Sequence, residues 1–129
     1  MQKRLRRLTT AFYDALSGRD IAAMRCVWAD RPYIVNIGPR SRMMDVGYDA
    51  VMPYWERSFN FFSRMSSVSS NTRIRVNGDV AWAIGNETAD LQPRSGGDVL
   101  RFETFVTHVF ERIDGKWMLV SHHAQMVPR

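Results

Sequence analysis

Near the start of the chain, apolar residues recur at spacings of three or four positions: Leu5, Leu8, Phe12 and Leu16. This period places them on one face of a helix, so the sequence predicts an amphipathic helix over roughly residues 3 to 17. Gly18 provides a stop signal, and Asp20 is a suitable N-cap for a shorter second helix that ends before Pro32.

A third helix is predicted from about Tyr48 to Phe62, because its large apolar residues also share one face: Val51, Trp55, Phe59 and Phe62. Pro53 is compatible with this helix if it lies in the first turn. Between the second and third helices, residues 33–37 have the composition of a strand. Residues 38–41 have turn chemistry, and residues 43–44 are expected to form a short returning strand.

The second half of the chain is strand-like and is divided by two tight turns. Asn77-Gly78 is the strongest hairpin signal, and Asp114-Gly115 is a second one. Residues 92–98 form a loop rich in Gly, Ser and Pro. The serine-rich stretch over residues 63–71 shows no clear period, and only its second half is expected to enter a strand that runs up to Val76. The other strands are expected from 80 to 91, from 100 to 112 and from 116 to 126.

This order of helices followed by strands predicts an α+β fold, with helices on one face of an antiparallel sheet. The strand over residues 100–112 carries large apolar residues on both faces. Phe102 and Phe110 lie on one face, and Phe105 and Val109 lie on the other. A sheet with one wetted face alternates more cleanly. We therefore expect a second chain to cover the other face, which makes the protein a homodimer.

The composition narrows the classes of protein further. A length of 129 residues fits a single domain over residues 1–129, and 45% hydrophobic residues exclude overall disorder. No apolar run is long enough to span a membrane. The single cysteine excludes an internal disulfide and a thiolate zinc site, and favours a cytoplasmic location. A net charge of +5 is compatible with nucleic-acid binding. The basic residues are scattered along the chain, however, so no nucleic-acid partner is expected.

Five segments, taken in order, resemble one known superfamily: residues 14–20, Trp28-Ala29-Asp30, Gly47 with Tyr54-Trp55, residues 78–82, and residues 114–124. Together they are similar to the nuclear transport factor 2-like superfamily, and most similar to its SnoaL-like branch. The resemblance covers nearly the whole chain. It implies a curved antiparallel sheet wrapped into a cone by three helices, a pocket inside the cone, and dimers formed through the outer face of the sheet.

The resemblance does not determine the activity, because relatives include isomerases, dehydratases, cyclases, hydrolases and non-catalytic assembly domains. Ketosteroid isomerisation needs a carboxylate base, a tyrosine and a protonated acid. The base would fall at Asn36 and the tyrosine near Phe12, while residues 104–110 contain no Asp or Glu. The sequence therefore predicts that this chain is not a ketosteroid isomerase.

Histidine is the remaining candidate for acid–base chemistry near neutral pH. His123 shares a strand face with Trp117 and Leu119, which the resemblance places inside the cone, whereas His122 points the other way. His123 and His108 are therefore the candidate catalytic residues. The alternative is that each is a neutral, hydrogen-bonded core residue. No metal site is expected, since adjacent His122 and His123 cannot chelate one ion, and no cofactor motif is present.

Several aromatic and polar residues are expected to line the pocket, or alternatively to fill the core: Trp28, Tyr33, Asn36, Tyr54, Trp55, Phe59, Phe102, Thr104 and Trp117. The sequence thus predicts a protein that binds a small apolar or amphipathic ligand. It is either a cofactor-free isomerase, dehydratase or cyclase acting by proton transfer, or a non-catalytic ligand-binding or dimerisation module.

Overall fold

The computed structural model describes residues 2–128 and has the predicted α+β architecture, with its helices in the N-terminal half. The helices are α1 (Gln2–Ser17), α2 (Ile21–Val27) and α3 (Tyr48–Phe61). The strands are β1 (Val35–Ile37), β2 (Asp45–Val46), β3 (Phe62–Asn77), β4 (Val80–Pro93), β5 (Leu100–Ile113) and β6 (Lys116–Met126).

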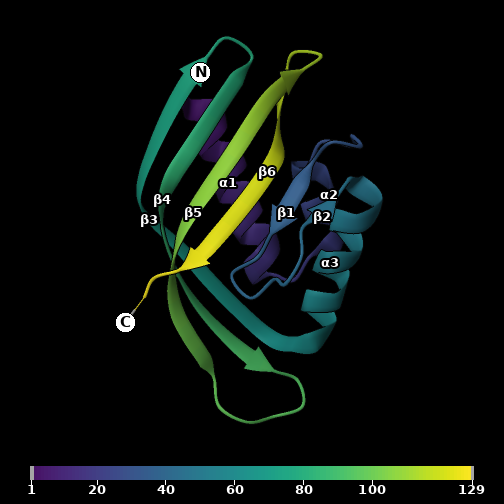
Figure 1. Ribbon diagram of the computed structural model, residues 1–129, viewed down its shortest axis with the longest axis vertical. Coiled ribbons are helices and arrows are strands. Elements are labelled where there is room, and N and C mark those ends of the chain that lie inside the picture. The colour runs from purple at the N-terminus through teal and green to yellow at the C-terminus, as the bar shows by residue number, and fades with distance from the viewer. Residues whose placement is uncertain (1, 129) are drawn as a thin grey trace.

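The strands form one sheet in the order β2-β1-β6-β5-β4-β3. All neighbours are antiparallel except β1 and β6, which run parallel. The sheet is strongly curved, and α1 runs behind it while α2 and α3 lie beside its β1–β2 end (Figure 1). The two predicted tight turns are confirmed, because Asn77 pairs with Val80 and Ile113 pairs with Lys116.

Three local features differ from the sequence-based expectation. The short returning strand expected at residues 43–44 is β2, which begins two residues after Met43. Pro53 is the sixth residue of α3 and not part of its first turn, so the helix lacks the backbone hydrogen bond that residue 53 would donate to the Asp49 carbonyl. The serine-rich segment after α3 belongs to β3 along its whole length. Serine occupies both faces of this strand, so the segment shows no alternation of apolar and polar residues.

The core lies between the concave face of the sheet and the helices. Its largest fully buried side chains come from α1, α2, β5 and β6 and the segments between them: Trp28, Phe12, Phe110, Leu5, Met24, Ile34 and Leu119. The apolar face predicted for α1 is thus the buried face, with Leu5, Phe12 and Leu16 all under 7% exposed. Burial of such side chains contributes about 1.5–3 kcal/mol each.

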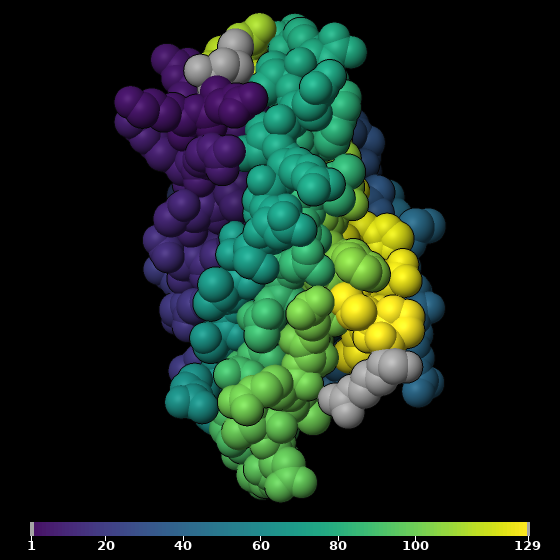
Figure 2. All heavy atoms as spheres, turned by 90° about the vertical axis from the view of Figure 1, so that its left-hand side faces the viewer, coloured from purple at the N-terminus to yellow at the C-terminus, as the bar shows by residue number. Residues whose placement is uncertain are grey.

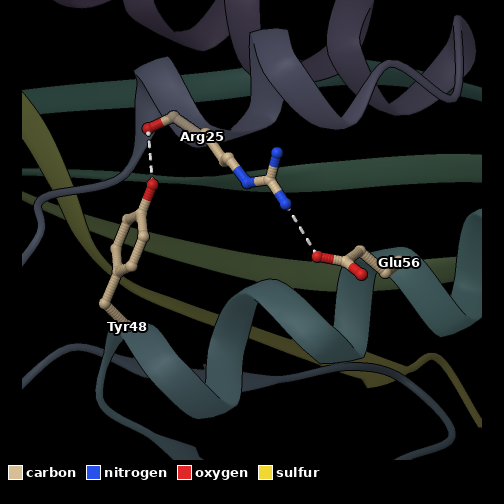
Figure 3. Close-up of polar contacts among 3 residues, drawn as sticks. All are labelled: Arg25, Tyr48 and Glu56. Atoms are coloured by element: carbon tan, nitrogen blue, oxygen red, sulfur yellow. Dashed lines mark hydrogen bonds and ion pairs between the residues drawn. The ribbon is translucent and has the colours of Figure 1, made fainter.

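Helices α2 and α3 are joined by polar contacts on their outer side (Figure 3). The Arg25 guanidinium donates to a Glu56 carboxylate oxygen at 2.9 Å, and the Tyr48 hydroxyl donates to the Arg25 carbonyl at 3.4 Å. Both charged side chains are nearly half exposed, so the ion pair stabilises the fold by at most about 1 kcal/mol. Its relevance is positional, because α3 carries Tyr54 and Trp55.

The outer face of the sheet has large apolar side chains in the open. Val68, Ile84 and Phe105 are 62%, 47% and 48% exposed, and all three point away from the helices. In a side view, strand residues coloured teal, green and yellow form a continuous surface that α2 and α3 do not cover (Figure 2). Within residues 2–128, no helix is long and apolar enough to cross a membrane.

Candidate functional site

A pocket of about 390 Å³ opens between the concave face of the sheet and α3. Its wall is mostly apolar and comes from both α-helices and strands: Leu16, Trp55, Phe62, Met65, Leu91 and Phe102. Polar side chains interrupt this wall: Arg40, Ser41, Tyr54, Arg57, Ser58, Ser67, Glu87 and His122. A largely apolar pocket with a few convergent polar groups is the usual form of a small-molecule site.

Glu87 is the buried carboxyl of the pocket. It lies on the inner face of β4, in line with Ala83 and Ala89, and is only 4% exposed. Removal of the charged form from water raises the pKa of Glu87 above its usual value. A raised pKa makes the ionised carboxylate a stronger base than a carboxylate at the surface.

A bulge in the neighbouring strand accompanies the placement of Glu87. The pairing of β3 with β4 slips between Ser70 and Arg73. The displaced residues press against Gly85, where an added Cβ would lie 2.9 Å from the Ser70 carbonyl oxygen. Only glycine allows this close approach, and the bulge bends the sheet two residues before Glu87.

Two hydroxyls lie beside the carboxyl. Those of Tyr13, on α1, and Ser67, on β3, lower the pKa of Glu87, but by less than burial raises it. Conversely, burial and the nearby Glu87 raise the pKa of Tyr13, so its phenol stays protonated. The Tyr13 hydroxyl, the Ser67 hydroxyl and one Glu87 oxygen form no hydrogen bond of standard geometry within the described residues. Small movements of these groups would let them bind the carboxyl or a ligand.

A second buried polar pair joins β5 and β6. Nε2 of His108 and Nδ1 of His122 are 2.7 Å apart, so one nitrogen donates and the other accepts. Burial lowers the pKa of His108 to about 3 and that of His122 well below its usual value, so both rings are neutral at pH 7. The Phe12 ring packs against both imidazoles, with centroid distances of 4.7 and 5.1 Å.

The expected orientation of His123 is wrong. His122 is 3% exposed and lines the pocket, whereas His123 lies on the exposed face. The reason is a bulge at Val120: Phe110 pairs with Leu119, but Val109 pairs with Ser121. The extra residue shifts the alternation by one and exchanges the two histidines.

The bulge coincides with a change of partner along β6. At Leu119 the strand receives a backbone hydrogen bond from Ala29. From Ser121 onward it pairs instead with β1, where Val35 is opposite Ser121. The extra residue at Val120 lies between these two partners.

Tyr54 occupies the part of the pocket nearest to the loop between β1 and β2. Burial raises the pKa of its phenol, and the neighbouring polar groups of Ser58, Ser41 and Asn36 partly reverse that effect. The hydroxyl lies directly against the backbone of Gly38, where a Cβ would overlap it. Gly38 is therefore required for the position of Tyr54.

The structure places only three of the nine predicted ligand-binding residues in the pocket wall, namely Tyr54, Trp55 and Phe102. Five others lie in the buried interior outside that wall: Trp28, Asn36, Phe59, Thr104 and Trp117. Tyr33 is 49% exposed, and its hydroxyl donates to Glu111. These six residues therefore do not line the pocket: five are packed in the core, and Tyr33 lies at the surface.

Sequence reasoning missed the roles of Glu87, Tyr13 and Ser67. Glu87 lies an even number of residues from Ala83, Ala89 and Leu91 and so shares their buried strand face. A charged residue among apolar residues on one strand face was the available signal. Tyr13 adjoins Phe12, the position where a phenol had seemed to be missing. Among residues 2–128, no three His, Cys, Asp or Glu side chains come together as a metal-ligand set.

Comparison with known proteins finds a relative by sequence and several by structure. An F-box protein, SKIP8 of Arabidopsis thaliana, is 26% identical over 120 residues, which are 93% of this chain. The chain spans about half (48%) of that protein.

Two solved structures share the fold across nearly the whole chain. One is a protein of the NTF2-like family from Streptomyces avermitilis that is proposed to be a dehydratase. It superposes with a TM-score of 0.87 at 21% identity, and the match covers 98% of this chain and 96% of that protein's chain. A proposed calcium/calmodulin-dependent protein kinase II association domain from Xanthomonas campestris has a TM-score of 0.82 at 21% identity, covering 97% and 86%.

The sequence profile of the SnoaL-like domain matches residues 5–128, from the first buried leucine of α1 to the end of the described chain. That span includes every strand of the sheet and every polar group of the pocket. The chain therefore belongs to the SnoaL-like domain family.

Proposed function

We propose that this protein binds a small, largely apolar molecule in the 390 Å³ pocket and transfers a proton at a carbon next to a carbonyl group. The observation that carries this proposal is Glu87, a carboxyl that is 4% exposed, has a raised pKa and lines an otherwise mostly apolar pocket. An unpaired carboxyl is costly to bury, and active sites are where such groups are concentrated.

In this mechanism the ionised Glu87 takes a proton from the carbon, and the electron pair of that C–H bond forms the double bond of an enolate. The carbonyl oxygen then carries the negative charge and needs a hydrogen-bond donor. His122 is neutral and lines the same pocket, so its ring can supply an N–H. Return of the proton to another atom gives isomerisation, and loss of a neighbouring hydroxyl as water gives dehydration.

His108 has a positioning role in the proposal. Its 2.7 Å hydrogen bond holds one nitrogen of His122, which determines whether the other nitrogen carries a proton. His108 is 2% exposed and does not line the pocket. His123 takes no part in the chemistry, because its side chain lies on the other face of the sheet.

The test is hydrogen exchange into enolisable ketones, which does not require the physiological substrate. The protein is incubated with 2-tetralone in D₂O, and loss of the α-proton signal is followed by NMR. We expect exchange above the buffer rate, and a loss of about 100-fold or more in Glu87→Gln. Glu103→Gln, an exposed carboxyl on β5, is the matched control. Exchange that is equal in the two variants would refute the role of Glu87.

The second candidate function is a non-catalytic dimerisation module, and the exposed apolar face of the sheet favours it. We propose that a second copy of this chain covers Val68, Ile84 and Phe105. The two functions are compatible, because the pocket and this face lie on opposite sides of the sheet. Ligand binding without any α-proton exchange by the wild-type protein would leave the non-catalytic function as the better account.

A further inference from the structure

The pocket has an electrostatic asymmetry in addition to its apolar wall. Arg40, in the loop between β1 and β2, and Arg57, on α3, both line it. Both side chains are exposed, and neither makes a hydrogen bond or ion pair with another described residue. By contrast, Arg25, Arg101 and Arg112 are each paired with a carboxylate.

The acidic groups around the pocket do not neutralise these two arginines. Glu87 is the carboxyl in the lining, and it is buried in the interior, whereas the two arginines are exposed. Asp45 lies near Tyr54, but it faces Asn36, whose amide donates to it at 3.5 Å. His122 is neutral. The mouth of the pocket therefore has a positive potential above an apolar interior.

From this arrangement we propose that the ligand is an amphipathic carboxylate, with its anionic group at Arg40 and Arg57 and its apolar body in the pocket. The inference rests on the proposed function, of which it names the substrate class. The exposed arginines mark the mouth and the buried Glu87 marks the interior, so the carbon that loses a proton lies on the apolar part of the ligand, away from the carboxylate. Guanidinium groups suit this role because they bind carboxylates through two parallel hydrogen bonds.

The size of the pocket limits the ligand. A volume of 390 Å³ lies at the lower end of the usual range for small-molecule pockets, about 300–1,000 Å³, so a bicyclic aromatic acid is of suitable size. 2-Naphthoate is thus a suitable probe, and 2-naphthamide is its neutral counterpart of the same shape. The difference between their affinities isolates the effect of the charge.

Binding of both probes to the full chain is measured by isothermal titration calorimetry at low ionic strength. We expect naphthoate to bind about tenfold more tightly than naphthamide, and this preference to shrink in 0.5 M NaCl as the charges are screened. Arg40→Gln and Arg57→Gln should each weaken naphthoate binding about fivefold and change naphthamide binding less than twofold. Arg42→Gln, from the same loop but outside the pocket wall, is the matched control.

Three results would overturn the inference. Equal affinity for the two probes would leave the pocket as a neutral apolar site, and the proposed proton transfer would be unaffected. An equal loss of naphthoate binding in Arg42→Gln would show that only the overall charge matters. Absence of binding for both probes would exclude an aromatic acid of this size. Thermal unfolding followed by circular dichroism confirms that each variant is folded before its affinity is compared.

Discussion

Replacement of Glu87 by Gln keeps the size of the side chain and removes its ability to ionise, so it isolates the energetic consequence of a buried charge. Burial raises the pKa of Glu87 in the folded state. At low pH the carboxyl is protonated in both the folded and the unfolded states, and its ionisation costs no stability. As the pH rises from the unfolded-state pKa through the folded-state pKa, the unfolded chain ionises first, and the wild-type protein loses stability.

The magnitude follows from linkage. Each unit by which the folded state raises the pKa of Glu87 removes about 1.4 kcal/mol from the free energy of unfolding at high pH. Glu87→Gln lacks this loss, so its stability relative to wild type should increase with pH by the same amount. For a domain of this size, 1 kcal/mol corresponds to about 4 °C in Tm. The glutamine N–H₂ can itself lack an acceptor, which adds an offset that does not depend on pH.

The assay is urea unfolding followed by circular dichroism at pH 4 and pH 8, at constant ionic strength. The quantity of interest is the difference between variant and wild type at each pH, because the buried histidines contribute to both proteins and their effect cancels to first order. Glu103→Gln, which removes an exposed carboxyl, should show no such trend. A Glu87→Gln difference that stays constant or shrinks as the pH rises would refute the argument that burial raises the pKa of Glu87.

Three further predictions follow from other parts of the fold. Because the pKa of His108 is lowered to about 3, this histidine binds its proton at a higher pH in the unfolded chain than in the folded protein. Below about pH 6.5, His108 should therefore reduce the stability of the wild type by about 1.4 kcal/mol per pH unit. In urea unfolding, the stability of His108→Gln should fall less steeply with decreasing pH by that amount. Gly38→Ala should displace the Tyr54 hydroxyl and lower the free energy of unfolding by about 1–3 kcal/mol, as measured by thermal unfolding. An unchanged stability would show that the loop accommodates the methyl group and that Gly38 is not required. Sedimentation at micromolar concentration should give twice 14.9 kDa, and Phe105→Asp should give a monomer of unchanged circular dichroism, whereas a monomeric wild type would contradict the second-copy proposal.

Most of the fold could be predicted because its signals are local. Helix α1 shows a clear 3.6-residue period, and the two Gly-containing turns determine the pairing of four of the strands. The face of β4 that carries Glu87 follows from the Asn77-Gly78 hairpin alone, since Ala81, Ala83 and Glu87 are separated by even numbers of residues. This part of the site was therefore accessible from sequence.

The residues of the pocket wall were harder to predict, because an aromatic side chain on the inner face can either fill the core or border a cavity. Trp28 and Trp55 are both almost fully buried, at 1% and 3% exposed, yet only Trp55 lines the pocket. The difference is set by where the three helices leave a gap against the curved sheet. That gap depends on contacts between segments far apart in the chain, so neither residue type nor spacing can reveal it.

The histidine pair shows how one inserted residue can build a site. The Asp114-Gly115 turn pairs Phe110 with Leu119, and continuation of that register would place His108 opposite Ser121. With Val120 as an extra residue, His108 lies opposite His122, and the two imidazoles come within 2.7 Å on the inner face. The bulge thus both turns His122 inward and supplies its partner. It lies where β1 replaces Ala29 as the neighbour of β6, and both neighbours lie more than 80 residues earlier in the chain. The hydrogen-bonded pair is consequently a property of the assembled sheet, which the alternation of residues within β6 could not show.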